Sequence, residues 1–249
     1  MRQWIQVIVL TLVAVLMIAF GYEILQLQIN NTQNSNLNEK VLYQISSYDV
    51  MASGDYTGKI TYGELAKHGD FGIGAFQGMN GEMLAIDGVF YQIPTTGTPI
   101  IVDSSLTTPY AMVSFFEVDY SLIVQETMNY TELKAFIDNN LPTLNGIFSV
   151  KIHGNFSYIK ARSVPFQTEP YPQLSDVIAN QTVFTLTDEA GTIVGYRCPS
   201  YMSGINVAGY HCHFITDDKT AGGHMLDFIA QNVTIEIDHI QKYYVEYLP

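Results

Sequence analysis

The sequence has 249 residues, of which 47% are hydrophobic and 14% are charged, a composition that excludes a disordered chain and allows one large domain or two small ones. Its 24 acidic and 11 basic side chains give a net charge of −13 at pH 7. Because such a surface repels phosphate backbones, nucleic-acid binding is not expected. The two cysteines, Cys198 and Cys212, are too few for a disulfide framework or a thiolate zinc site.

The first segment of the chain is strongly apolar. Residues 4–22 carry no charge and are numerous enough to cross a bilayer as a helix, while Arg2 precedes them and residues 19–21 fit a signal-peptidase site. Residues 1–25 are therefore predicted to be a membrane anchor or a cleaved signal peptide, and both alternatives place the rest of the chain outside the cytoplasm. Residues 26–39 are polar and rich in Asn, which predicts a linker.

Residues 40–150 show patterns for two short helices and a hairpin. Residues 61–64, with the sequence TYGE, are a capping-box pattern, which predicts a helix that stops at Gly69. The strand patterns EMLAI and VFYQI flank Asp87-Gly88, a dipeptide that favours a type I′ hairpin turn. Apolar residues at helical spacing predict a second helix over residues 131–140.

Strand patterns dominate residues 151–249. A second hairpin is predicted around Gly154-Asn155, and a short helix that contains Leu174 and Ile178 follows it. The remaining strand patterns are VFTL, TIVGYR, INVAGYHCHFI and NVTIEIDHI. The chain is therefore predicted to be a strand-dominated α+β protein with two mixed or antiparallel sheets and few short helices. We divide it into subdomains 40–150 and 151–249, with a metal site between them.

Three of the six histidines lie close together in the sequence. His211 and His213 alternate with Cys212, so in a strand both imidazoles point to one face, about 6.5 Å apart, and the thiol points to the other. A turn then returns the chain antiparallel and can bring His224 beside the pair. Gly222 and Gly223 have no side chains, so the backbone can pass close to a bound ion. Three neutral imidazoles with an open fourth position are typical of catalytic zinc sites.

Histidines on a strand face also occur as solvated or hydrogen-bonded side chains, and the spacing leaves this alternative open. Cys212 is a weak rival ligand because strand alternation turns it away. His68, His153 and His239 have no neighbouring ligand pattern and are interpreted as surface or core residues.

Two charged residues outside the histidine cluster are candidates for a site. Arg162 lies in a predicted strand with the aromatic residues Phe156 and Tyr158 on the same face, and its guanidinium could bind a substrate carboxylate in a bidentate manner. Glu82 follows Gly81 and opens a strand, where it could act as an acid or base. A structural ion pair and an ordinary strand-edge charge are the alternatives, and spacing alone does not connect either residue to the histidines.

Four stretches occur in order between residues 40 and 248: GDFGIGAFQGMNGEMLAIDGVFYQI, TPYAMVSFF, RSVPFQTEPYPQL and GTIVGYRCPSYMSGINVAGYHCHFITDDKTAGGHMLDF. They are similar to the motif series of the alpha-acetolactate decarboxylase family, and the last stretch, with its histidine block, is the most specific.

The resemblance implies the decarboxylation of (S)-2-acetolactate to (R)-acetoin and CO2, a step in acetoin and butanediol formation, by a homodimer. It implies zinc, or another divalent transition metal, on His211, His213 and His224. The family's active-site arginine and glutamate fall on Arg162 and Glu82. The metal would be the electron sink, so no organic cofactor is expected, and the substrate would be a small 2-hydroxy-3-keto acid.

The sequence departs from the family pattern at two places. The family usually has a threonine in the pattern G-x-G-T-F, where this sequence has Ala75. Family members usually continue past the last strand into a tail that returns a glutamate to the metal site, whereas this sequence ends at Pro249 and Glu246 lies too early to be an obvious substitute. Both departures predict a weakened rather than an abolished activity.

Two other functions are compatible with the histidines. One is a non-catalytic extracytoplasmic domain that binds zinc or carbohydrate, which would have no need of Arg162 or of the segment around Glu82. The other is a cupin-type metalloenzyme. That motif expects a glutamate a few residues after the histidine pair, and this sequence has Asp217-Asp218.

Overall fold

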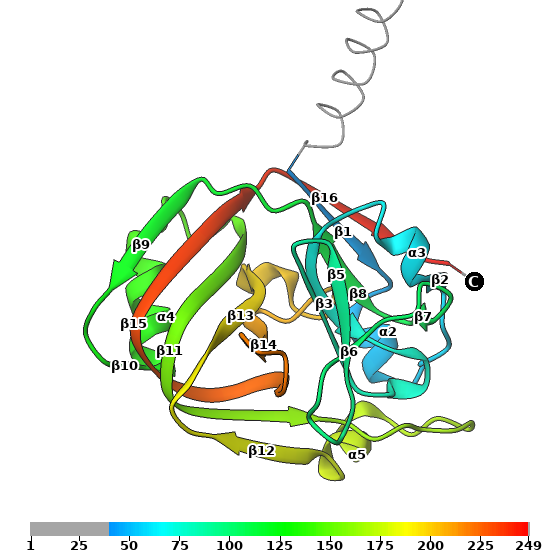
Figure 1. The fold of residues 1–249 in the computed structure, drawn as a ribbon. Helices are drawn as coiled ribbons and strands as arrows, with labels where there is room; N and C mark the ends of the chain where they lie inside the picture. Colours follow the sequence, from blue (N-terminus) through cyan, green and yellow to red (C-terminus); the bar gives the residue numbers. More distant parts are fainter. Residues whose placement is uncertain (1–39, 249) are drawn as a thin grey trace, which may run out of the picture. The chain divides into compact units, whose positions relative to one another are not determined.

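The computed structural model describes residues 40–248 (Figure 1). The predicted anchor or signal peptide and the predicted linker, residues 1–39, lie outside the described residues. Among residues 40–248 no helix has both the length and the apolar character to cross a bilayer. Strands are the main element of the described chain, so the predicted strand-dominated α+β class is confirmed.

The first sheet has seven strands. Their order is β16 (Lys242–Glu246), β1 (Val41–Ile45), β8 (Ala111–Ser114), β3 (Phe71–Ala75), β4 (Glu82–Ile86), β5 (Val89–Ile93) and β6 (Ile100–Ile101). The strands β1 and β16 run parallel, and all other neighbours in this sheet are antiparallel. A separate two-stranded sheet joins β2 (Ile60–Thr61) to β7 (Thr107–Thr108).

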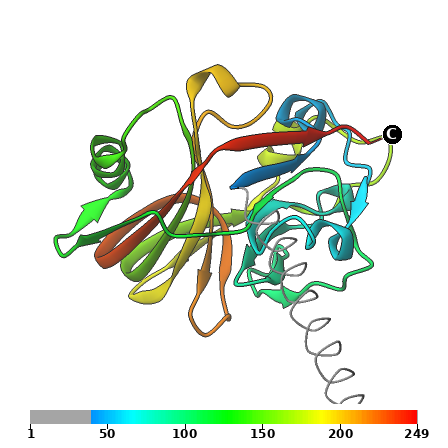
Figure 2. The ribbon, with the colours of Figure 1, turned by 90° about the horizontal axis from the view of Figure 1, so that it is seen from above.

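The second sheet is antiparallel throughout. Its order is β10 (Met128–Asn129), β15 (Gly222–Ile240), β14 (Gly209–Thr216), β13 (Glu189–Cys198), β11 (Ile147–Ser163) and β12 (Thr182–Leu186), and β9 (Tyr120–Val124) pairs with β15. Because β11 also pairs with β15, the strands β11, β13, β14 and β15 pair in a closed cycle. After β15 the chain passes directly into β16, so it leaves the second sheet for the first (Figure 2).

The helices are short. They are α2 (Tyr48–Ala52), α3 (Tyr62–Leu65), α4 (Tyr130–Asn140) and α5 (Leu174–Ala179), with 3-10 turns η1 (Gln77–Met79) and η2 (Ser200–Met202). The three helices predicted from the sequence are confirmed. For α3, Thr61 accepts the predicted hydrogen bond from the Glu64 amide, but the helix ends before Gly69 is reached.

The two predicted hairpins have different outcomes. The first is confirmed: β4 and β5 pair across Asp87-Gly88, whose φ angles of 51° and 76° suit the predicted turn. The second is wrong, because residues 147–163 form one continuous strand. At Gly154 the strand passes so close to β15 that a Cβ atom would lie 2.4 Å from the Asn232 carbonyl oxygen. The glycine therefore permits a local shift of register and not a reversal of the chain.

Side-chain alternation in the second sheet separates two apolar clusters. Val194 and Tyr196 of β13 pack against Ile73 and Met112 of the first sheet, in a cluster that joins the two sheets. The neighbouring residue Ile193 belongs to a second cluster, on the opposite face. That cluster contains Phe148, Phe156, Cys212, Phe214, Phe228 and Ile235, and the α4 residues Leu133 and Ile137. The second sheet is thus covered on both faces, and one of its faces is turned toward the first sheet.

Candidate active site

The strand β14 places two of the three clustered histidines on one face. His211 and His213 line a cavity together with residues of the first sheet, whereas Cys212 and Phe214 belong to the apolar cluster on the opposite face. The predicted alternation is therefore confirmed, and the Cys212 thiol is turned away from the histidines. It is buried, and burial raises the pKa of this thiol to about 12.

The third histidine arrives through the predicted return of the chain. The strands β14 and β15 pair antiparallel with His213 directly opposite His224. The glycine before it makes the close approach possible, because a Cβ atom at Gly223 would lie 2.6 Å from the carbonyl oxygen of Arg162 on β11. On its other side, β15 pairs His224 with Arg162. The pairing thus sets Arg162, His224 and His213 in one row across three strands.

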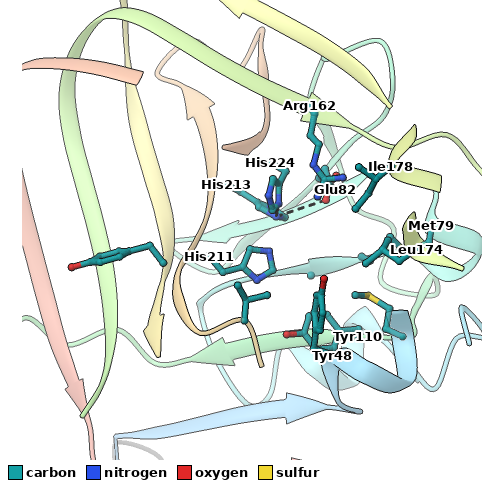
Figure 3. Close-up of a pocket in the computed structure, with 15 residues that line it drawn as sticks. Tyr48, Met79, Glu82, Tyr110, Arg162, Leu174, Ile178, His211, His213 and His224 are labelled. Carbon is teal, nitrogen blue, oxygen red and sulfur yellow. Dashed lines mark hydrogen bonds and ion pairs between the residues drawn. The ribbon is translucent and has the colours of Figure 1, made fainter. Parts of the chain in front are cut away.

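The three imidazoles converge (Figure 3). One ring nitrogen of each lies within 4.8 Å of the other two, and His213 Nε2 is 3.2 Å from His224 Nδ1. His213 Nδ1 donates a hydrogen bond to the Met83 carbonyl oxygen at 2.7 Å, which leaves a lone pair on Nε2. His211 Nδ1 is buried without a hydrogen-bond partner among residues 40–248.

Burial keeps these imidazoles neutral. Burial, and secondarily the positive charge of Arg162, lowers the pKa of His211 to about 3. Burial also holds the pKa values of His213 and His224 well below the usual range. Neutral imidazole is the form that ligates metal ions. The converging nitrogens and the unpartnered His211 Nδ1 therefore fit a transition-metal ion such as zinc.

The two charged candidates lie beside the histidines. Arg162 Nη1 is 3.8 Å from Glu82 Oε1, and Glu82 Oε2 is 3.7 Å from His213 Nε2. These distances exceed hydrogen-bond length, and Glu82 Oε1 and Arg162 Nη1 are both buried without a hydrogen-bond partner in the described part of the chain. Burial raises the pKa of Glu82 to about 7, although the charge of Arg162 opposes the rise. Polar atoms that are unpartnered and face a cavity indicate a site for a ligand.

The cavity has a volume of about 180 Å³ and joins this polar cluster to an apolar wall. The sequence patterns did not predict the apolar wall of the cavity. Its side chains come from α2, η1, α5 and the loop before β14, which have no common sequence signal. The lining residues are Tyr48, Met51, Gly74, Ala75, Met79, Glu82, Tyr110, Arg162, Leu174, Ile178, Val207, Tyr210, His211, His213 and His224. An anionic group would be held at one end and small alkyl groups at the other.

The predicted surroundings of Arg162 need a correction. Phe156 packs edge-on against Phe214 and Phe228 in the apolar core, and the residues that line the cavity include neither it nor Tyr158. The pairing of β11 with β15 shifts register twice between residues 154 and 158 and once more between residues 160 and 161. At the shift between Phe156 and Tyr158 the extra residue, Ser157, lies on β11, whereas the other two shifts leave the extra residue on β15. Simple alternation across Ser157 therefore fails, because one inserted residue puts Phe156 on the opposite face of β11 from Arg162.

The structure shows where the two departures from the family pattern lie, at Ala75 and near Glu246. Ala75 lines the cavity and pairs directly with Glu82 across β3 and β4, so a longer side chain there would face the site. Glu246 lies on β16, where its carboxylate accepts a hydrogen bond from the Tyr43 hydroxyl. It is not among the cavity residues of the described chain.

The other histidines behave as the sequence predicted. His68 stacks on Tyr43 and His239 stacks on Phe148, while the exposed His153 lies 3.2 Å from Asp217. Within residues 40–248 the group of His211, His213 and His224 is the one set of three side chains arranged to hold a metal ion.

Comparison with known proteins agrees with this geometry. The sequence profile of the alpha-acetolactate decarboxylase family matches residues 42–248. The alpha-acetolactate decarboxylase of Methanosarcina mazei is 48% identical over 204 residues, which cover 82% of this chain and 71% of that protein; that of Klebsiella aerogenes is 36% identical over 208 residues, covering 84% and 80%. The crystal structure of the Bacillus subtilis enzyme superimposes with a TM-score of 0.82 at 31% identity, covering 84% of this chain and 89% of that one.

Proposed function

The chain belongs to the alpha-acetolactate decarboxylase family, and we propose that it uses the cavity described above to convert acetolactate into acetoin and CO2. One observation carries this assignment. The three histidines, Arg162 and Glu82 come from strands far apart in the sequence and line a single cavity, inside a family match that spans nearly all of the described residues.

The metal in this proposal is zinc, held by His211, His213 and His224. Their neutral, converging imidazoles support this assignment. When bound, the ion would supply a Lewis acid that polarises the ketone of the substrate and accepts the electron density released with CO2.

Arg162 binds the substrate carboxylate in the proposed reaction. Its guanidinium is buried beside the histidines and has an unpartnered Nη1, so a carboxylate can take up the hydrogen bonds that no described residue satisfies. The bond between the carboxylate carbon and C2 then breaks, and its electron pair moves toward the ketone.

Glu82 handles the proton that completes the reaction. A carboxyl group whose pKa is raised to about 7 can be protonated or ionised near neutral pH, which suits an acid or base. Delivery of the proton to C2 from one face gives a single enantiomer, and the family resemblance assigns (S)-2-acetolactate as substrate and (R)-acetoin as product. The apolar wall, which includes Met79, Leu174 and Ile178, would receive the methyl groups.

The direct test is the release of CO2 and acetoin from racemic 2-acetolactate. The metal-loaded protein should form acetoin well above the uncatalysed background, consume at most one enantiomer rapidly, and stop when a chelator removes the metal. Readdition of zinc should restore the activity. A folded, zinc-loaded protein that forms no acetoin above background would contradict the proposal and favour a non-catalytic zinc-binding domain.

We also propose an extracytoplasmic location and a homodimer. The apolar residues 4–22 support the location, and the family resemblance is the basis for the dimer. Cell fractionation with N-terminal sequencing of the mature protein distinguishes an anchored chain from a cleaved one. Light scattering of the purified protein measures the number of subunits.

A further inference from the structure

A buried side-chain hydrogen bond joins the strand that carries Arg162 to the strand pair that carries Glu82. Ser163, next to Arg162 at the end of β11, donates from Oγ to the carbonyl oxygen of Ile93 at 2.7 Å. Ile93 is the residue that pairs with Glu82 across β4 and β5. Ser163 is completely buried, so water does not compete for this hydrogen bond.

Backbone contacts continue the same junction. The carbonyl oxygen of Val164 accepts from the Gly81 amide at 3.2 Å, and the Gln167 amide donates to the Gly78 carbonyl oxygen at 2.6 Å. The two segments lie so close that a Cβ atom at Gly78 would come within 2.4 Å of the Phe166 ring. The chain after Arg162 is therefore held along the chain before Glu82.

The junction matters because Arg162 and Glu82 belong to different sheets and are not hydrogen-bonded to each other. Their charged atoms form an ion pair at 3.8 Å, which is longer than a hydrogen bond, so the side-chain tips hold their separation only loosely. That separation depends on how the two backbones are joined, and among the hydrogen bonds of the junction described above only that of Ser163 uses a side-chain atom.

We propose that Ser163 is a positioning residue, whose hydrogen bond to Ile93 sets Arg162 and Glu82 at the separation that decarboxylation requires. The proposal rests on the proposed function above. It assigns to Ser163 no contact with the substrate: the residue acts through the two charged groups.

The test compares Ser163→Ala with Ser149→Ala as a matched control. Ser149 lies on the same strand, is equally buried, and its hydroxyl is 3.1 Å from Ser114 of the first sheet, but it is not one of the residues that line the cavity. Both variants should lower the melting temperature by similar amounts. Ser163→Ala should also lower kcat about ten- to a hundredfold with KM changed less than about threefold, since misplaced groups slow the chemical step, whereas Ser149→Ala should keep kcat within twofold.

Two further variants separate positioning from general destabilisation. Ser163→Thr keeps the hydroxyl and should restore most of kcat, while Ser163→Cys, a weaker donor, should fall between Ala and Thr. The effects of Ser163→Ala and Arg162→Lys on kcat should be less than additive in the double variant. Once Arg162 is exchanged, loss of the Ser163 hydrogen bond should lower kcat by less than about threefold further.

Three results would overturn the inference: equal kcat in Ser163→Ala and Ser149→Ala, full additivity with Arg162→Lys, or a Ser163→Thr variant that folds but is as slow as the Cys variant. If Ser163→Ala does not fold, the Cys and Thr variants decide. An unmodified protein that forms no acetoin would instead contradict the proposed function, so the two failures are distinguishable.

Discussion

Burial acts in opposite directions on the acidic and basic groups of the cavity. It lowers the pKa of the three histidines and raises the pKa of Glu82, because in each case a buried charge is unfavourable. In the metal-free protein the histidines are therefore neutral at pH 7, and Glu82 takes both the protonated and the ionised form near that pH. A bound cation would favour the ionised form of Glu82.

The pH dependence of the metal-free protein tests the state of Glu82. Its pKa rises from 4.5 in the unfolded chain to about 7 in the folded protein, so the native state binds the extra proton between these values. The contribution of Glu82 to stability is then greatest below pH 4.5 and is lost as the pH rises through 7, by up to about 3 kcal/mol. In Glu82→Gln this loss should be absent. Urea unfolding of both metal-free proteins from pH 4.5 to 8 measures the difference, and parallel curves would contradict it.

Exchange of Arg162 for Lys should impair catalysis strongly. An ammonium group cannot make the bidentate contact of a guanidinium with a carboxylate, so kcat/KM should fall at least tenfold with little change in stability. Steady-state kinetics give the result. The control is Arg197→Lys, at an arginine that pairs with Asp138 outside the cavity, and its kcat/KM should stay near that of the unmodified protein. Arg162→Lys with unmodified turnover would refute the role in carboxylate binding.

A threonine at position 75 should raise the rate or the enantioselectivity. Ala75 faces the cavity opposite Glu82, so the added hydroxyl can donate a hydrogen bond to substrate oxygen atoms. A positioned proton donor contributes about 10²–10⁴-fold, and part of this range is the expected gain. Chiral chromatography of acetoin measures both effects. Ala75→Val, of the same shape without the hydroxyl, should give no gain; equal rates in the two variants would contradict the argument.

At the scale of elements, short sequence patterns predicted the turns and strand alternations that depend on neighbouring residues alone. The Asp87-Gly88 turn and the alternation of β14 could be predicted from the sequence, because a dipeptide determines the first and a five-residue pattern the second. The sequence did not predict that β11 is one continuous strand. Its Gly154 has the sequence appearance of a turn, and only the neighbouring β15 makes it a register shift.

The return hairpin that delivers His224 should depend on Gly223. A Cβ atom there meets the Arg162 backbone at 2.6 Å, whereas at Gly209, on the same strand pair, nothing lies within 4 Å. Both glycines have positive φ angles, 152° and 84°. Gly223→Ala should therefore lower the free energy of unfolding by about 3 kcal/mol and weaken metal binding, and Gly209→Ala by about 1 kcal/mol. Chemical denaturation measures both, and equal losses would contradict the steric argument.

At the scale of the molecule, the site combines residues that no sequence window contains. The resemblance to a family joined Glu82 and Arg162 to the histidines, but spacing could not. The apolar wall from α2, η1 and α5 was not predicted, because it arises only when the two sheets pack together. Long-range pairings of this kind leave no periodic pattern in the sequence.

Metal removal should destabilise the whole fold, since the ligands lie on β14 and β15, which share a pairing cycle with β11 and β13. Free zinc at about a hundredfold its dissociation constant should stabilise the protein by about 3 kcal/mol. Thermal unfolding with and without a chelator measures this. His224→Asn should abolish the difference and His153→Asn, at an exposed histidine, should retain it; a chelator effect in both variants would place the metal elsewhere.

The parallel pair of β1 and β16 has a consequence for biosynthesis. Val41 pairs with Lys242, a partner that a ribosome makes about 200 residues later. Until then β1 has an open hydrogen-bonding edge, which is the part of a sheet most prone to pair with other chains. The first sheet is therefore complete only after β16 has been made, and a nascent chain that stalls before β16 would expose an unpaired strand edge to chaperones.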